Sequence, residues 1–169
     1  MPRTALIVAV PEAEQLVGEW RAKHDSSAQH GVPAHITLLF PFMPVEEVDE
    51  QILGELRDLF ASQPSFRYRL PRVARFPEVA WLAPDPASPF SDLTELIVSR
   101  YPEYPPYEGI HDEVIPHLTV AEGGPELQDE VDAALTPSLP LEAEALEVTM
   151  IVEDASGEWH SGERFPLQL

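Results

Sequence analysis

The sequence is poor in two residue types, since it contains no cysteine and a single lysine, Lys23, among 169 residues. Without cysteine the chain can form no disulfide, no thiolate metal site and no cysteine nucleophile, so any catalysis depends on histidine, hydroxyl or carboxylate groups. Ten basic residues stand against thirty acidic ones, which gives a formal net charge of −20. Because such a surface repels the backbone of long nucleic acids, extended RNA or DNA is not an expected partner. A small nucleotide or another compact phosphoester can still bind at one local positive spot.

The sequence also lacks a long hydrophobic run. The apolar stretch 5–10 is too short to span a membrane, and Pro11 and Glu12 follow it at once, where a signal peptide would continue apolar. We therefore expect a cytoplasmic protein that does not enter a membrane. With 44% hydrophobic residues the chain can bury the core of one domain, which we expect to span residues 1–169 and to be a monomer.

Two halves of the chain show the same order of predicted elements. Short β-branched or alternating runs predict strands, and apolar residues three and four apart predict helices. In the first half these are strands 4–10, 35–40 and 66–76 with helices 11–24 and 45–62. In the second half they are strands 79–83, 117–121 and 146–152 with helices 89–101 and 125–135, and 159–167 is expected to add an edge strand. This order predicts an internal duplication, roughly 4–76 and 79–153, with a pseudo-twofold relation between the halves.

The strongest signal is a His-x-Thr triplet that occurs once in each half, as His35-Ile-Thr37 and His117-Leu-Thr119. With six histidines and six threonines in the chain, two or more such triplets arise by chance about 2% of the time. In a strand, residues two apart point to the same face, so each histidine shares a face with its threonine. A pseudo-twofold arrangement would then bring the two histidines face to face across a central cleft.

Two facing pairs of imidazole and hydroxyl groups are suited to phosphoryl transfer. One neutral histidine can take a proton from an attacking water or hydroxyl, while the other, protonated, gives one to the departing oxygen. The hydroxyls of Thr37 and Thr119 can donate hydrogen bonds to the non-bridging phosphate oxygens, where charge builds in the transition state. This scheme needs neither a metal ion nor a cofactor.

The blocks Val32-Pro-Ala-His-Ile-Thr-Leu-Leu-Phe-Pro-Phe42 and Val114-Ile-Pro-His-Leu-Thr-Val-Ala121 resemble the two signature strands of the 2H phosphoesterase superfamily. That superfamily includes the bacterial 2'-5' RNA ligase-like proteins and cyclic nucleotide phosphodiesterases. The resemblance implies an α+β, two-lobed fold with antiparallel sheets around a central groove, in which the two lobes are interleaved along the sequence. It also implies His35 and His117 as catalytic acid and base, with the two threonines binding phosphate. The implied chemistry is the opening or forming of a phosphodiester, commonly a 2',3'-cyclic or 2'-5' linkage.

Three further residues are candidates for substrate binding. Arg67 and Arg69 share one face of the predicted strand 66–76 and can supply a positive spot, although a solvated strand face that balances nearby acids explains them as well. Tyr107 lies in a loop rich in proline and tyrosine before the second triplet. Its ring can stack on a base, or it can pack the loop against the body of the protein.

The loop histidines His24, His30 and His111 are expected to be exposed, because no helical HExxH motif or cysteine pair anchors a metal site. The sequence thus favours a metal-independent phosphodiesterase that acts on a small cyclic phosphate of a nucleotide or sugar. Two alternatives stay open. One is a non-catalytic protein that binds a phosphorylated ligand. The other is a 2'-5' RNA ligase or RNA end-processing enzyme, which would need more basic residues than this chain has.

Overall fold

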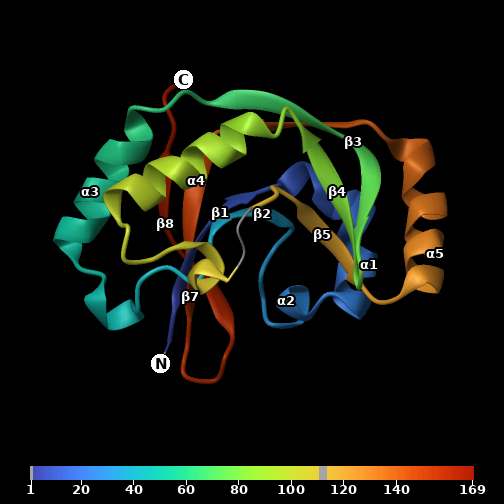
Figure 1. Cartoon of the computed structure of the whole chain (residues 1–169), viewed down its shortest axis with the longest axis horizontal. Helices are drawn as coiled ribbons and strands as arrows, with labels where there is room; N and C mark the ends of the chain where they lie inside the picture. The colour runs from blue at the N-terminus through green and yellow to red at the C-terminus, as the bar shows by residue number, and fades with distance from the viewer. Residues whose placement is uncertain (1, 111–113) are drawn as a thin grey trace.

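A computed structural model describes residues 2–110 and 114–169, and Figure 1 shows how its elements are arranged. The strands are β1 (Thr4–Ala9), β2 (His35–Leu39), β3 (Phe66–Phe76), β4 (Val79–Asp85), β5 (Leu118–Glu122), β6 (Leu141–Ala145), β7 (Glu147–Glu153) and β8 (Trp159–Pro166). The α-helices are α1 (Glu14–His24), α2 (Ser26–Gln29), α3 (Glu50–Ala61), α4 (Ser88–Arg100) and α5 (Pro125–Leu135). Short 3-10 turns lie at Pro11–Ala13, Val45–Glu47, Pro106–Gly109 and Thr136–Ser138.

The first sheet of the described residues has four strands in the order β2-β1-β7-β8, and each neighbouring pair is antiparallel. Its central strand β1 is the apolar run predicted at 4–10, and five of its six residues are buried. The run is β-branched and apolar on both faces, as a strand covered on both sides requires. The strand predicted at 159–167 is β8, which lies at the edge of the sheet as expected.

The second sheet has the order β5-β4-β3-β6, again with antiparallel neighbours. In β3 the alternation predicted from the sequence is confirmed, because Tyr68 and Leu70 are buried while Arg67 and Arg69 are exposed. Strand β6 was not predicted, since its Leu-Glu-Ala-Glu-Ala sequence consists mostly of residues with low β propensity. It is extended because its backbone pairs with β3 from Leu141 to Ala145.

Each half of the chain contributes one strand to the sheet that contains the His-x-Thr segment of the other half. Strand β3 follows β1 and β2 along the chain, yet it pairs with β4 and β6 in the second sheet. Strand β7 follows β4 and β5, yet it pairs with β1 and β8 in the first sheet. The two halves of the sequence are therefore interleaved in an α+β, two-lobed fold, with a His-x-Thr segment at the β2 edge of one sheet and at the β5 edge of the other.

One hydrophobic core joins the two lobes. It combines β1 residues such as Leu6 and Val8 with Leu82 of β4 and Val120 of β5, all at most 1% exposed. The helices also cross between the lobes, because α1 packs against β5 and α4 packs against β2. In Figure 1, α3 and α4 lie at the left of the molecule and α5 at the right, with β2 and β5 between them. Strands β2 and β5 contact one another, which brings the two His-x-Thr segments together.

The predicted helices differ from the observed ones mainly at their starts. The helix predicted at 11–24 begins with a 3-10 turn before α1, and the helix predicted at 45–62 becomes α-helical only at Glu50, where Asp49 caps it by accepting from the Ile52 amide at 2.9 Å. The single-turn helix α2 lies in a segment that was predicted as a loop. None of the described helices is long and apolar enough to cross a membrane.

Candidate active site

The two His-x-Thr segments line one pocket of about 410 Å³. His35 and Thr37 reach it from β2, whereas His117 lies just before β5 and Thr119 within it. On the opposite face of the same strands, Ile36, Leu38, Leu118 and Val120 are at most 1% exposed. Burial of the alternate residues in the core fixes which face each strand turns to the pocket, because a shift by one residue would bury the polar side chains. The structure thus brings all four predicted side chains to one place.

Each pocket histidine is oriented by the backbone. The Nδ1 of His35 lies 2.8 Å from the carbonyl oxygen of Pro33, and the Nδ1 of His117 lies 2.7 Å from that of Ile115. Since a carbonyl oxygen only accepts hydrogen bonds, Nδ1 must carry the proton in both rings. Nε2 is therefore the nitrogen that gains or loses a proton in each ring. This shared arrangement was not predicted from the sequence.

Burial makes both imidazoles hard to protonate. Desolvation lowers the pKa of His35 to about 4, against the Pro33 carbonyl that raises it. The charge of Arg21 lowers this pKa further, the charge of its partner Asp25 raises it, and a charge on His117 lowers it. Desolvation also lowers the pKa of His117, against the Ile115 carbonyl. Because a charge on His117 disfavours a charge on His35, the site is more easily singly than doubly protonated. That is the state needed by a pair made of one acid and one base.

An aromatic pair holds the ring of His117. Phe76 and Trp81 stack on each other with centroids 4.6 Å apart. Both meet the imidazole edge to face, at centroid distances of 5.2 and 5.8 Å. Trp81 is also the cross-strand partner of Thr119 in β4 and β5. This packing supports His117 and Thr119 with one rigid surface.

A buried ion pair supports the pocket wall beside His35. Arg21 and Asp25 are only 3% and 2% exposed, and the Nε of Arg21 donates to Asp25 at 3.0 Å. The same guanidinium donates to the carbonyl of Val32 and to the hydroxyl of Ser27. Asp25 also caps α2 by accepting from the Ser27 amide. The pair ties together the start and the end of the 25–32 segment, which forms one side of the pocket.

This ion pair was not predicted from the sequence. One available signal is that Arg21 lies four residues after the buried Val17, on the face of α1 that is turned inward. A cation on the apolar face of a helix is rarely buried without a partner, and Asp25 follows one turn later.

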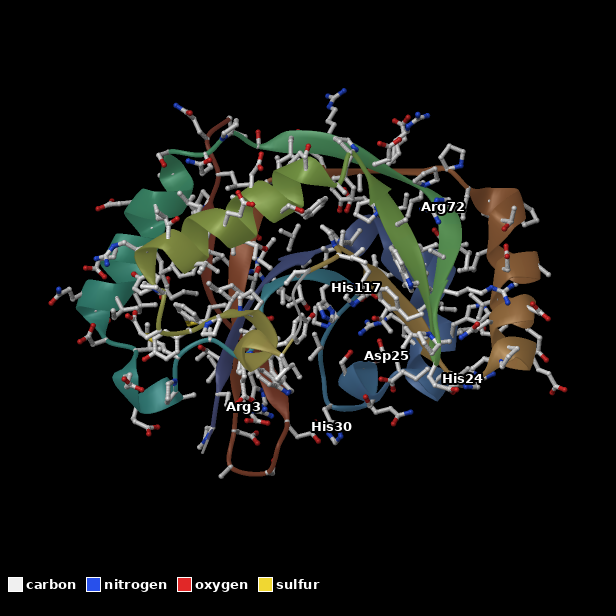
Figure 2. The ribbon with its side chains drawn as sticks, viewed as in Figure 1. Arg3, His24, Asp25, His30, Arg72 and His117 are labelled. Carbon is white, nitrogen blue, oxygen red and sulfur yellow. The ribbon has the colours of Figure 1, made fainter. Side chains whose placement is uncertain are left out.

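Aromatic side chains form another part of the wall. The ring of Phe40 lies 5.9 Å from Trp159 and 6.4 Å from Tyr107 between centroids. The guanidinium of Arg3 covers Phe40 at 5.0 Å and is held by two hydrogen bonds to Glu153. Figure 2 shows Arg3 and Asp25 on different sides of the region below His117. The pocket therefore has an aromatic side near Arg3 and a polar side near Asp25.

Tyr107 belongs to this aromatic side through an unusual backbone conformation. Its φ of 50° lies in the left-handed region that residues with a side chain rarely adopt, and so does the φ of 57° at Glu108. The Tyr107 amide donates to the carbonyl of Phe40 at 2.6 Å, which holds the turn in place. Strain of this kind persists only where the surroundings impose it, and here it places the ring in the pocket.

The other predicted binding residues lie elsewhere. Arg67 and Arg69 are exposed on β3, outside the pocket, and their cross-strand partners on β6 are Glu144 and Glu142. Since the inward face of β3 is apolar, these arginines have to point away from the core, so the structure does not bring them to the site. His30 lines the pocket and contacts Glu158, whereas His24 does not line it. His111 lies outside the described residues.

The two threonine hydroxyls are available to a ligand. Within residues 2–110 and 114–169, no protein group hydrogen-bonds to the side chain of Thr37 or Thr119. In that part of the chain, no three His, Cys, Asp or Glu side chains are grouped so as to hold a metal ion. The pocket therefore offers a ligand two hydroxyl donors and two imidazoles held by the backbone, which is a set of groups suited to a phosphate.

Known proteins share the sequence pattern and the fold of this chain. A sequence profile of the 2'-5' RNA ligase superfamily matches residues 9–157. Among solved structures, LigT of E. coli complexed with 3'-AMP is 20% identical, with a TM-score of 0.65 and 100% of both chains covered. TT0787 of Thermus thermophilus is also 20% identical, with a TM-score of 0.64 and 98% of both chains covered. LigT of E. coli complexed with NADP+ is 21% identical, with a TM-score of 0.61, covering 99% of this chain and 98% of that one. No curated protein matches the sequence significantly.

Proposed function

Because the chain belongs to the 2'-5' RNA ligase superfamily, we propose that it is a phosphodiesterase that opens a small 2',3'-cyclic or related nucleotide or sugar phosphate. The observation that supports this most is the pocket itself. It combines two imidazoles in the same tautomer with two unengaged hydroxyls from strands 82 residues apart. Two imidazoles of this kind supply both proton transfers of a hydrolysis, so the proposed reaction proceeds without a metal ion.

His35 is the proposed general base. Its low pKa and the nearby charge of Arg21 keep it neutral at neutral pH, so its Nε2 is ready to accept a proton. As water attacks phosphorus, Nε2 of His35 takes one of its protons and the new phosphorus–oxygen bond forms. The charge that develops on the non-bridging oxygens is met by hydrogen bonds from Thr37 and Thr119.

His117 is the proposed general acid. Its pKa is lowered by burial but not by a neighbouring cation, so it is the easier of the two rings to protonate. When the phosphorus–oxygen bond to the sugar breaks, Nε2 of His117 gives its proton to the departing oxygen. The product is a phosphate monoester with a free sugar hydroxyl. His35 then loses its proton and His117 regains one by exchange with solvent.

The aromatic side of the pocket is the proposed place for a base. Tyr107, Phe40 and Trp159 offer flat apolar surfaces there, and stacking of a base on such rings contributes about 1–3 kcal/mol. Structures of E. coli LigT are complexed with 3'-AMP, NADP+ and ATP, all of which carry adenine. A volume of about 410 Å³ is suited to one small nucleotide and not to a folded nucleic acid.

A panel of nucleoside 2',3'-cyclic phosphates, incubated with enzyme and EDTA, tests the proposal. We expect turnover that resists the chelator, and losses of roughly 10²–10⁴ in kcat for His35→Ala and for His117→Ala. Thr37→Val and Thr119→Val keep the shape of the strand and should lower kcat through the lost hydroxyls. His24→Ala serves as the matched control, because this histidine does not line the pocket.

The same panel separates the alternatives. If activity persists unchanged in both pocket histidine variants, the proposed site is wrong. If no compound is cleaved but one binds tightly in calorimetry, the protein is a non-catalytic phospho-ligand binder. Strong salt-dependent binding to an oligonucleotide with joining of its ends would instead indicate a ligase, against the expectation from the net charge of −20.

A further inference from the structure

The two halves of the pocket differ at one pair of equivalent positions. Phe40 lies five residues after His35, and Glu122 lies five residues after His117. Both side chains line the pocket, so the same place in the two halves carries an aromatic ring on one side and a carboxylate on the other. The two halves thus contribute the same His-x-Thr groups to the pocket, but different side chains five residues after each histidine.

Arg3, Asp25 and Glu122 are the acidic and basic side chains, apart from histidines, that line the pocket among the described residues, and two of these three have a partner of opposite charge. Arg3, the one lysine or arginine of the described residues in the lining, is held by Glu153. Asp25 is held by Arg21 in the buried pair. Glu122 is different, because no salt bridge connects it to a cation in the described ranges.

Glu122 is held in place by neutral groups instead. One carboxylate oxygen accepts from the Ser26 amide at 2.8 Å and the other from the Ser26 hydroxyl at 3.2 Å. These two bonds fix the side chain between β5 and the start of α2 but leave its negative charge uncompensated. The polar side of the pocket thus carries one negative charge that is fixed in place and has no cationic partner among the described residues.

We propose that Glu122 is a specificity-determining residue, which makes the pocket select phosphodiesters with no second phosphate. This inference rests on the proposed function. With the reacting phosphate between the threonines and a base on the aromatic side, the rest of the sugar faces Ser26, Ser27 and Glu122. A carboxylate accepts hydrogen bonds from a sugar hydroxyl or an amine. It repels a phosphate monoester, which carries about −1.5 to −2 charges at neutral pH.

The expected size of this selection is modest because Glu122 is exposed to water. At a few ångströms in a medium close to water, one carboxylate against a phosphate monoester corresponds to roughly a tenfold difference in kcat/KM at low ionic strength. Salt shortens the reach of the charge, so the difference should shrink as ionic strength rises.

The test compares adenosine 2',3'-cyclic phosphate with the same compound that carries a 5'-phosphate. Wild-type enzyme should prefer the first by roughly tenfold in kcat/KM at low salt, chiefly through KM. Glu122→Gln keeps the length of the side chain and one oxygen acceptor for Ser26, and it should bring the ratio close to one. Glu122→Arg should reverse the preference. Glu126→Gln removes an exposed charge outside the pocket and should leave the wild-type ratio unchanged.

Each outcome bears on a different claim. A purely structural role of Glu122 would lower kcat/KM for both compounds alike, so an unchanged ratio in Glu122→Gln overturns the inference. Equal turnover of both compounds by wild type also overturns it, while the proposed function stands. If neither compound is cleaved, the proposed hydrolysis fails. The role of Glu122 is then tested by calorimetry, which compares the affinities for adenosine 3'-phosphate and adenosine 3',5'-bisphosphate. Tighter binding of the first, lost in Glu122→Gln, supports the selection, and equal or absent binding refutes it.

Discussion

At the scale of single residues, the hydrogen bonds from His35 and His117 to the carbonyls two positions earlier set the chemistry of the pocket. They place the proton of the neutral ring on Nδ1, so Nε2 is the nitrogen that exchanges protons in the proposed mechanism. Each bond also favours the protonated ring, but burial outweighs it at both positions. The balance between the two effects predicts the pH range in which the enzyme works.

The pH profile of kcat/KM should be a bell that lies on the acidic side of neutrality. The base must be neutral, so activity is lost as the pH falls through the His35 pKa of about 4. The acid must be protonated, so activity is lost as the pH rises through the pKa of His117, which is lowered from the usual value of about 6.5. Both limbs should therefore lie below about pH 6.5.

Initial rates from pH 3.5 to 9 measure this profile, and NMR titration of each histidine assigns the limbs. In the profile of kcat both limbs should move to higher pH, because a bound phosphate anion favours the protonated rings. An optimum near pH 8 in kcat/KM would contradict the proposed roles of the two histidines.

Removing one member of the buried pair should be costly for stability. Arg21→Leu leaves the carboxylate of Asp25 buried without its partner, and breaking a buried pair in this way costs about 3–5 kcal/mol of unfolding free energy. Urea denaturation at pH 7 measures the loss. Asp25→Asn in the same background should recover part of it, because it removes the uncompensated charge and keeps the oxygen that accepts from Ser27.

Arg57→Leu provides the matched control for this experiment. Its side chain is 51% exposed and pairs with Glu163 at 3.4 Å, and an exposed pair of this kind contributes about 1 kcal/mol or less. Similar losses in the two leucine variants would mean that Arg21 does not act through a buried ion pair.

At the scale of elements, the β7–β8 hairpin packs against the segment that follows α2. The Trp159 amide donates to the His30 carbonyl at 2.8 Å, and Gly31 lies directly beside the Trp159 backbone. A Cβ on Gly31 would come within 2.8 Å of the Trp159 carbonyl oxygen, and the φ of Gly31 is +97°. Only glycine fits this contact, which places Trp159 in the pocket wall.

Gly31→Ala should therefore lower both stability and kcat/KM. Gly157→Ala is the matched variant, because Gly157 has a φ of +88° with nothing within 4 Å of its Cβ position. The Gly157 variant carries only the backbone strain, about 1–2 kcal/mol, and should keep its activity. Thermal denaturation and cyclic phosphate turnover compare the two. Equal effects on stability and on turnover would show that the contact with Trp159 is unimportant.

The elements with a clear period could be predicted from the sequence, and the pairing of strands could not. The apolar run of β1, the alternation of β3 and the His-x-Thr strands each carry their own local signal. Strand β6 carries almost none, since it owes its conformation to a neighbour about 75 residues away in sequence. The exchange of β3 and β7 between the sheets is likewise a contact between distant segments, and nothing in either strand specifies it locally.

The residues of the candidate site could likewise be predicted only in part. The two triplets could be located because their spacing repeats, whereas the support from Arg21 depends on burial, which a single charged residue does not reveal. The positive spot expected at Arg67 and Arg69 came from charge density along the chain. In the folded protein these side chains point to the outer face of β3, opposite the glutamates of β6.

At the scale of the whole molecule, the net charge of −20 opposes folding through mutual repulsion of carboxylates. Sodium chloride screens this repulsion, since the Debye length falls from about 10 Å at 0.1 M to about 3 Å at 1 M. We expect the melting temperature to rise by a few degrees across this range, which corresponds to about 1 kcal/mol for a protein of this size. Calorimetry at several sodium chloride concentrations measures the melting temperature. A flat or falling melting temperature would mean that repulsion is not a significant cost.

The exchange of β3 and β7 also determines what a half-length protein could do. A chain cut in the turn between β3 and β4 would give two pieces. The first would keep β1 and β2 without their sheet partners β7 and β8, and the second would keep β4, β5 and β6 without β3, which lies between β4 and β6. Either piece alone would have an unpaired strand edge and only one of the two His-x-Thr triplets, and only recombination of the two pieces would restore the paired sheets and the complete pocket. The two halves of the chain thus resemble the subunits of a dimer joined by a covalent link, since neither can complete its own sheet.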